Sequence, residues 1–412
     1  MRKFFFGCVL ILVVSFYLFP ISFTFLPNAV NSKMLVAVFG ILAFIFDSSR
    51  KGAMEFAEPT LGALLLAVVF SVWCLFSVTI NDSTETTYAT YFVSFATWMA
   101  GAYGVVAAIR LFYFDEEINL ELITRYLAYV CVFQCIMAVL IDNNAGVAGF
   151  VDRIMDQGQD FYKKGHRLYG LGAALDPAGI RFSVVLTLMA HQIASNEEVR
   201  TRGWLLASYM FSFAVIMIIG SVISRTTMVG VILGSVYMAL SLIRLRKGGF
   251  ITFRLMRLFV LFFLFLGIIV GVTIFLYKSS ETFEEYLRFG FEAFFNWVET
   301  GEFHTTSTDT LNNEMWVWPT EFRTWMIGRG TLGVFQNNTD IGYCNFILYC
   351  GLIGLLFYSV YFVFCHLVLN RKFKNFWIPS LLLVAMTFIF WIKVSTDIFF
   401  IDALLFCIPA DV

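Results

Sequence analysis

The chain has 412 residues, 59% of them hydrophobic and 14% charged, and its mean hydropathy is +0.80. Because soluble domains carry roughly 25% charged residues, this composition excludes an ordinary soluble protein. The formal net charge of −1 gives no overall field that would attract nucleic acid. The eight cysteines lie almost entirely in apolar runs, so neither a disulfide framework nor a zinc site is predicted.

Apolar runs long enough to cross a bilayer as helices recur along the whole chain. The sequence lacks the alternating strands of a membrane barrel, so we predict an all-α polytopic membrane protein with about twelve spans. The predicted spans are 4–25, 33–48, 59–79, 90–113, 121–141, 175–194, 203–223, 226–243, 256–277, 341–368, 375–392 and 396–410. The first run is too long for a typical signal sequence, so we predict an uncleaved span there, and the last two could form one re-entrant pair.

Lysine and arginine residues fall in every second loop, which predicts that those loops and both termini are cytoplasmic. These residues are Arg2, Lys3, Arg50, Lys51, Arg110, Arg200, Arg202, Arg244, Arg246, Lys247, Arg254, Arg257, Arg371, Lys372 and Lys374. The register leaves one long external loop, 278–340, between spans nine and ten. We treat 1–412 as one transmembrane domain that carries this loop.

The long external loop is rich in aromatic residues. Acidic and aromatic residues alternate along 281–297 in the manner of an amphipathic helix that lies on a membrane surface. Trp316, Trp318 and Trp325 follow. These rings either anchor the loop at the interface or form a platform for sugars or an isoprenoid chain.

Arg225 is the clearest charged residue near a predicted membrane boundary. It lies in a very tight external turn, between Ser224 and Thr226, at the start of span eight. Unpaired backbone N–H groups, the positive end of the helix dipole and a guanidinium would coincide there, which favours a phosphate or diphosphate ligand. The alternative is an arginine that reaches to the external interface.

A second polar cluster precedes and opens span six. It contains His166, Arg167 and Tyr169, followed by Asp176 and Pro177. Aspartate before proline predicts a helix start with a capping side chain. Arg181 then lies about one turn inside the span, where it either binds an anion or forms a structural ion pair with a neighbouring helix.

A third group of polar residues lies late in the long loop and in the last spans. Glycines 328 and 330 flank Arg329 and would let the backbone approach a ligand closely. Asp340 either caps span ten or acts as a general base, and Lys393 either joins the anion site or forms a local ion pair with Asp397. The other candidates are Glu321 as an alternative base, and Arg323, Tyr343 and Asn345 as substrate-binding residues.

Ionisable groups near membrane depth are costly and are functional candidates by default. Arg167, Arg181, Arg225, Arg329 and Lys393 are predicted to converge on one external face. A lipid-linked diphosphate would satisfy them. The sequence shows no metal-ligand cluster, no nucleotide-binding loop of the Walker type and no paired acidic motif in a cytoplasmic domain.

The order of these motifs resembles the O-antigen polymerase family, within the group that includes the O-antigen ligases. The resemblance rests on Ser-Arg-Thr at 224–226, Arg-x-x-Gly at 167–170, Gly-x-Gly at 328–330 and Asp-Ile-Gly-Tyr at 340–343. Gly-Leu-Ile-Gly at 351–354 and Lys393 complete it, so it covers most of 160–400. Ligases carry a His-Asn pair after the long loop, and this chain has no histidine there, which favours a polymerase.

The resemblance implies a GT-C-like glycosyltransferase of the bacterial inner membrane. It would polymerise undecaprenyl-diphosphate-linked repeat units into O-antigen, lipopolysaccharide or capsule on the periplasmic face, without a metal or other cofactor. Its implied partners are the lipid-linked donor and acceptor glycans, membrane lipids and a chain-length regulator. A ligase-type transferase and a transporter or flippase of lipid-linked oligosaccharide are the alternatives.

Overall fold

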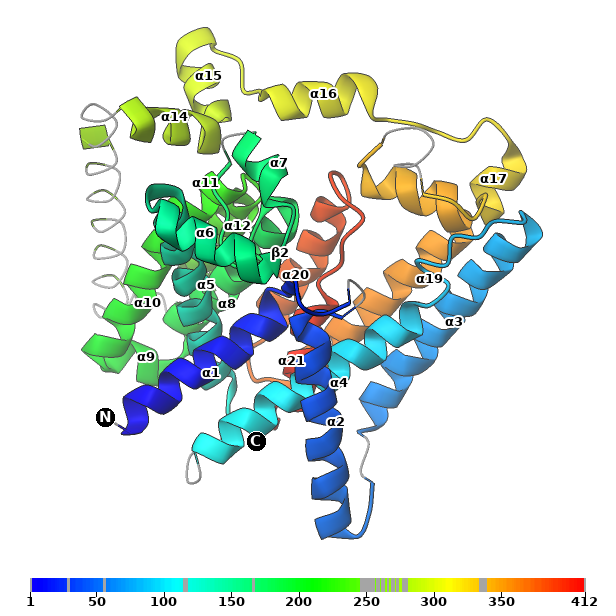
Figure 1. Ribbon diagram of the computed structural model, residues 1–412, viewed down its shortest axis with the longest axis horizontal. Coiled ribbons are helices and arrows are strands. Elements are labelled where there is room, and N and C mark those ends of the chain that lie inside the picture. Colours follow the sequence, from blue (N-terminus) through cyan, green and yellow to red (C-terminus); the bar gives the residue numbers. More distant parts are fainter. Residues whose placement is uncertain are drawn as a thin grey trace. The chain divides into compact units, whose positions relative to one another are not determined.

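The computed structural model describes residues 2–27, 30–54, 57–113, 118–164, 167–244, 281–332 and 339–410, with scattered positions between 256 and 275. Within these ranges the regular structure is helical apart from one antiparallel pair of two-residue strands. Contacts divide the chain into two compact units (Figure 1). Unit 1 comprises Met1–Leu18, Val30–Asn119 and Thr306–Val412, and unit 2 comprises Phe19–Ala29 and Leu120–Thr305.

Unit 1 contains helices from both ends of the chain. They are α1 (Arg2–Leu18), α2 (Ser32–Lys51), α3 (Glu58–Ile80), α4 (Tyr91–Phe112), α16 (Thr306–Glu314), α17 (Phe322–Ile327), α19 (Gly342–Lys372), α20 (Trp377–Phe390) and α21 (Phe399–Cys407). Helix α2 packs along α4, and α3 packs along α19. Gly40 and Gly104 make the first contact possible, since a Cβ on Gly104 would lie 2.6 Å from the Val36 carbonyl oxygen.

Unit 2 is built around α8, whose residues from Ala178 to Ala194 are almost all buried. Its elements are β1 (Ser22–Phe23), α5 (Leu120–Asn143), α6 (Ala145–Ile154), β2 (Met155–Asp156), α7 (Gln159–Lys164), α8 (Leu175–Ser195), α9 (Glu197–Thr201), α10 (Gly203–Val215), η1 (Ile216–Gly220, a π-helix), α11 (Ser221–Ile223), α12 (Thr227–Arg244), α14 (Glu281–Gly290) and α15 (Glu292–Thr300). Helix α12 packs on α8 where Gly230 meets the backbone of Ser183.

Six helices in the described ranges are long and apolar enough to cross a membrane: Ser32–Lys51, Glu58–Ile80, Tyr91–Phe112, Leu120–Asn143, Gly203–Ile223 and Gly342–Lys372. Shorter apolar helices cover Phe6–Leu18, Thr227–Ser241 and Trp377–Phe390. Large apolar side chains such as Leu42, Phe46 and Leu65 are exposed on α2 and α3, as lipid-facing residues are. The described part of the chain is thus an all-α, multi-pass membrane protein. The count of twelve spans stays a prediction, and most of the ninth, 256–277, lies outside the described residues.

Two predicted helices have different boundaries in the structure. The span predicted over 4–25 ends at Leu18, because Pro20 disfavours a helical conformation at Phe19. The residues that follow pair as β1 with β2, with Ser22 opposite Asp156. The single amphipathic helix predicted over 281–297 is two helices, α14 and α15, which meet where Gly290 packs against Val222.

Candidate functional site

The turn between α11 and α12 is tied to the start of α8. The hydroxyl of Thr226 donates a hydrogen bond to Asp176 Oδ1 at 2.5 Å, and that of Ser224 donates to the same atom at 3.5 Å. The predicted helix start is present, because α8 begins at Leu175, but Asp176 does not cap it. Its carboxylate instead accepts from the turn, so the hydroxyl of Thr226 already has a partner in the protein.

Arg225 extends from this turn to the helices of the long loop. Its Nε donates to the carbonyl oxygen of Phe289 at 2.8 Å, and its Nη2 lies 2.6 Å from Oε2 of Glu292. The guanidinium also lies over the Phe289 ring, 4.3 Å from the centroid. The side chains of the ion pair are only 21% and 19% exposed. Arg225 is therefore a docking point for α14 and α15.

Arg167 reaches the same aromatic ring. Its guanidinium carbon lies 5.9 Å from the centroid of Phe289 and 5.6 Å from that of Phe161. Burial lowers the pKa of Arg225, the charge of Arg167 lowers it further, and Glu292 and Asp176 oppose this. The structure thus brings together two of the predicted arginines, with Phe289 between them.

The other candidates of unit 2 have contacts of their own or lie outside the described residues. Arg181 is one turn into α8 as predicted, where its Nη1 donates to the carbonyl oxygen of Pro177 at 2.7 Å and its guanidinium faces Phe19. Tyr169 is a core residue that packs with Ile141 and Val151. His166 lies outside the described residues.

Arg329, in unit 1, lies in a loop that docks on α19. Its N–H donates to the carbonyl oxygen of Leu348 at 2.8 Å, and Gly330 N–H donates to that of Tyr349 at 3.0 Å. Gly328 has a φ of +85°, and a Cβ there would overlap the Tyr349 carbonyl. The flanking glycines were expected to admit a ligand, and in the structure Gly328 lies against the backbone of α19 while Gly330 lies against the backbone of α3 at Val78. Burial lowers the pKa of Arg329.

The reason for this docking is a break in α19 at Gly351, where φ is +69° and ψ is −177°. The break releases carbonyl oxygens that lipid cannot satisfy. The N–H groups of Arg329 and Gly330 satisfy two of them, Ser77 Oγ donates to Tyr349 at 2.7 Å, and Trp73 Nε1 donates to Cys350 at 2.8 Å. Gly351, the first residue of the Gly-Leu-Ile-Gly motif, is therefore the breaking point of a discontinuous span.

The other candidates of unit 1 divide into exposed and structural residues. Both candidate bases, Glu321 and Asp340, are exposed. Arg323 is exposed and donates to the carbonyl oxygen of Ile80 at 3.1 Å. Tyr343 donates to the carbonyl oxygen of Phe388 at 3.0 Å, and buried Asn345 donates to that of Thr339 at 3.1 Å.

The region of Lys393 contains a more extensive polar arrangement than a local ion pair. Lys393 is half-buried. Asp397 accepts hydrogen bonds from the hydroxyls of Tyr358 at 2.7 Å and Tyr91 at 3.0 Å, and from the N–H of Phe399. The convergence of Lys393 and Arg329 with the arginines of unit 2 stays a prediction.

The indole rings of the long loop form a row. Trp316 stacks on Trp318 with centroids 5.3 Å apart, and Trp318 stacks on Trp325 at 5.5 Å. The neighbouring Phe322 is exposed. An exposed row of this kind suits an interface anchor or a sugar-binding face, the two roles that the sequence left open.

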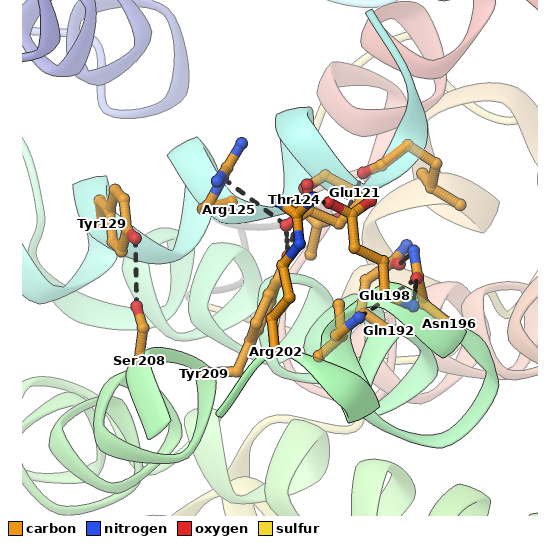
Figure 2. Close-up of polar contacts among 12 residues, drawn as sticks. Glu121, Thr124, Arg125, Tyr129, Gln192, Asn196, Glu198, Arg202, Ser208 and Tyr209 are labelled. Carbon is orange, nitrogen blue, oxygen red and sulfur yellow. Dashed lines mark hydrogen bonds and ion pairs between the residues drawn. The ribbon is translucent and has the colours of Figure 1, made fainter. Parts of the chain in front are cut away.

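Figure 2 shows a polar cluster that the sequence did not single out, although Glu121 and Arg125 at helical i, i+4 spacing were a visible signal. Glu121, in α5, is buried and lies 3.6 Å from Arg125 Nε. The hydroxyl of Tyr209, in α10, donates to the backbone oxygen of Glu121 at 3.1 Å and to its carboxylate at 3.3 Å. Nearby, Ser208 donates to Tyr129. These bonds join α5 to α10.

Among the described residues, no group of three or more His, Cys, Asp or Glu side chains is placed to hold a metal ion. No protein-family model, curated protein or solved structure matches the chain.

Proposed function

We propose that the chain is a membrane glycosyltransferase that polymerises lipid-linked oligosaccharide repeat units, with a polyprenyl diphosphate as the leaving group. The observation that carries the proposal is the ion pair of Arg225 with Glu292, at the edge of a membrane helix and beside Arg167. A guanidinium that pairs with a carboxylate also suits a phosphate, because both present oxygen atoms to its fork of N–H groups.

In this proposal Glu292 stands in for the diphosphate of the donor. The carboxylate holds Arg225 in place when the site is empty, and the more highly charged diphosphate displaces it. Arg225 and Arg167 then stabilise the negative charge that develops as the anomeric carbon–oxygen bond breaks. Loss of the Glu292 contact would free α15 to make room for the glycan.

The acceptor is a sugar hydroxyl of a second lipid-linked chain. Its oxygen attacks the anomeric carbon while a carboxylate removes the proton. Asp340 and Glu321, both exposed residues of unit 1, stay the predicted candidates for this base. Direct displacement inverts the anomeric configuration. Detection of a covalent glycosyl–enzyme adduct would contradict it.

The test replaces Arg225 with alanine in the organism that encodes the chain and resolves its surface polysaccharide by electrophoresis. We expect the long chains to disappear while single repeat units remain attached to their final acceptor. Arg202→Ala is the matched control, because Arg202 forms an exposed ion pair with Glu198 on α9. Immunoblotting of the membrane fraction checks that both variants insert. Normal chain lengths in Arg225→Ala would count decisively against a polymerase.

The same experiment separates the related ligase function. Loss of a ligase leaves finished polymer on its lipid carrier and not on the final acceptor. That outcome would move the proposal from polymerase to ligase without changing the role of Arg225.

A transporter of lipid-linked oligosaccharide is the second candidate, and the break in α19 at Gly351 favours it. Discontinuous spans form substrate sites in many transporters. If the chain is a transporter, an inactive variant would leave repeat units on the cytoplasmic leaflet, where an externally added glycosidase does not reach them. If it is a polymerase, an inactive variant would leave the repeat units accessible to that enzyme.

A further inference from the structure

A fully buried carboxyl and a fully buried imidazole face each other in unit 1. Asp402, in α21, is 0% exposed, and His366, in α19, is 1% exposed. Asp402 Oδ1 lies 3.6 Å from His366 Nδ1. Among the described residues, no hydrogen-bond partner is present for either carboxylate oxygen of Asp402 or for either ring nitrogen of His366.

The cost of burial determines which group of this pair carries the titratable proton. An isolated ionised carboxylate in an apolar interior costs far more than a protonated one. An ion pair with His366 would offset this only with good hydrogen-bond geometry, and 3.6 Å is too long for a direct hydrogen bond. The favoured state is therefore a neutral carboxylic acid beside a neutral imidazole, with the titratable proton on the carboxyl group of Asp402.

Two cations act on the C-terminal end of α21: Lys372 Nζ donates to the carbonyl oxygen of Phe406 at 2.8 Å, and Lys372 and Arg110 both act on Cys407. The titratable groups that act on Asp402, or on which it acts, are His366, Tyr361 and Cys365 from α19, Tyr17 from α1, and Asp397 from the connection between α20 and α21. Helix α4 packs on α21 through apolar rings, with Phe95 stacked on Phe399 at 4.8 Å. A negative charge on Asp402 would therefore be opposed by Asp397 and faced by His366 at 3.6 Å.

Tyr361 offers a candidate route for the proton. It is buried on α19 and interacts electrostatically with both Asp402 and Asp397, as well as with the Cys365 thiol. Asp397 is only half-buried. Asp402 would give its proton to the Tyr361 oxygen while Tyr361 gives its own to the Asp397 carboxylate. The tyrosine ends neutral and no electrons are transferred.

We propose that Asp402 and His366 form a proton-binding site inside the helical bundle, and that this site exchanges its proton through Tyr361 and Asp397. Proton relays in membrane proteins use chains of buried carboxyl and imidazole groups such as these. The site does not depend on the function proposed above.

Infrared spectroscopy of the purified full-length chain in detergent, labelled with [4-¹³C]aspartate, tests the site. We expect a protonated-carboxyl C=O band that shifts with the label and persists at pH 8, far above the pKa of about 3.9 of a free aspartate. The band should be absent from Asp402→Asn and present in Asp397→Asn. A difference spectrum between wild type and Asp402→Asn with only carboxylate bands would overturn the site. If Asp402→Asn does not fold, absence of the band from the labelled wild type at pH 8 would overturn it.

The proposed route is tested by transfer of the same samples into deuterated buffer. Tyr361→Phe should keep the band but slow its deuterium shift by about 10²-fold, the low end of what a positioned proton-transfer group contributes. Tyr349→Phe, in the same helix, is the control, because the Tyr349 hydroxyl donates to the carbonyl oxygen of Glu85 and not to Asp402, Tyr361 or Asp397. Equal exchange rates in wild type and Tyr361→Phe would refute the route.

Discussion

The substitution Glu292→Gln removes one charge from the contact that docks the long loop. At about 4 Å between charge centres and an effective dielectric constant near 20, the attraction is about 4 kcal/mol. Desolvation of two side chains that are 21% and 19% exposed opposes part of this, and a charged hydrogen bond contributes about 1.5–3 kcal/mol net. We therefore expect the docking of α15 to weaken by about 2 kcal/mol.

Hydrogen exchange measures this change directly. A loss of about 2 kcal/mol raises the population of the undocked helix by about 30-fold, so amides within Glu292–Thr300 should exchange about 30-fold faster. Peptides from α8 should not change. The matched control is Glu285→Gln, because Glu285 is exposed on the same loop in α14. The reasoning fails if the protection of α15 is unchanged by Glu292→Gln, or if both substitutions reduce it equally.

Three further substitutions test the packing described above, each by thermal unfolding in detergent. Gly351→Ala should destabilise unit 1 by about 3 kcal/mol or more, because the residue has φ +69° and its Cβ would overlap the Met326 carbonyl; Gly203→Ala, where a Cβ meets nothing within 4 Å, should be near neutral. Ser183→Ala should cost about 1–3 kcal/mol, since its hydroxyl donates to Thr226 and accepts from Gly230 N–H, whereas Ser359→Ala on α19 should cost less. Tyr209→Phe should cost about 1–2 kcal/mol by removing the hydroxyl that bonds Glu121, and an unchanged midpoint would show that this contact is dispensable.

The positions of the helices could be predicted because lipid requires long apolar segments with internally satisfied backbones. Helix α3 runs over Glu58–Ile80 where 59–79 was predicted, and α5 over Leu120–Asn143 where 121–141 was predicted. The early end of α1 at Leu18 was also predictable in principle, since Pro20 marks it. What hydropathy does not reveal is a break inside a span, such as that at Gly351. The break depends on N–H donors from residues 329 and 330, which are separated from Gly351 in the sequence.

The residues of the candidate site could be predicted from the sequence, but the side chains that they contact could not. The tight turn and the guanidinium of Arg225 were visible in the sequence, and so was the acidic, aromatic loop segment that holds Phe289 and Glu292. The contact between Arg225 and Glu292 depends on tertiary structure, because no local sequence pattern selects Glu292 over the other acidic residues of that segment. The same holds for Asp176. Its position before Pro177 indicated a helix cap, but its carboxylate accepts a hydrogen bond from the turn at 224–226 instead.

The break in α19 at Gly351 also constrains the order of membrane insertion and folding in unit 1. An unpaired carbonyl in lipid costs several kcal/mol, so a newly inserted α19 is more stable as a continuous helix. The segment at 328–330 precedes α19 in the chain and is made first. The helix can open at Gly351 only once that segment, Ser77 and Trp73 are in position to receive the released carbonyl groups. We therefore expect the opening of α19 at Gly351 to follow the insertion of that span.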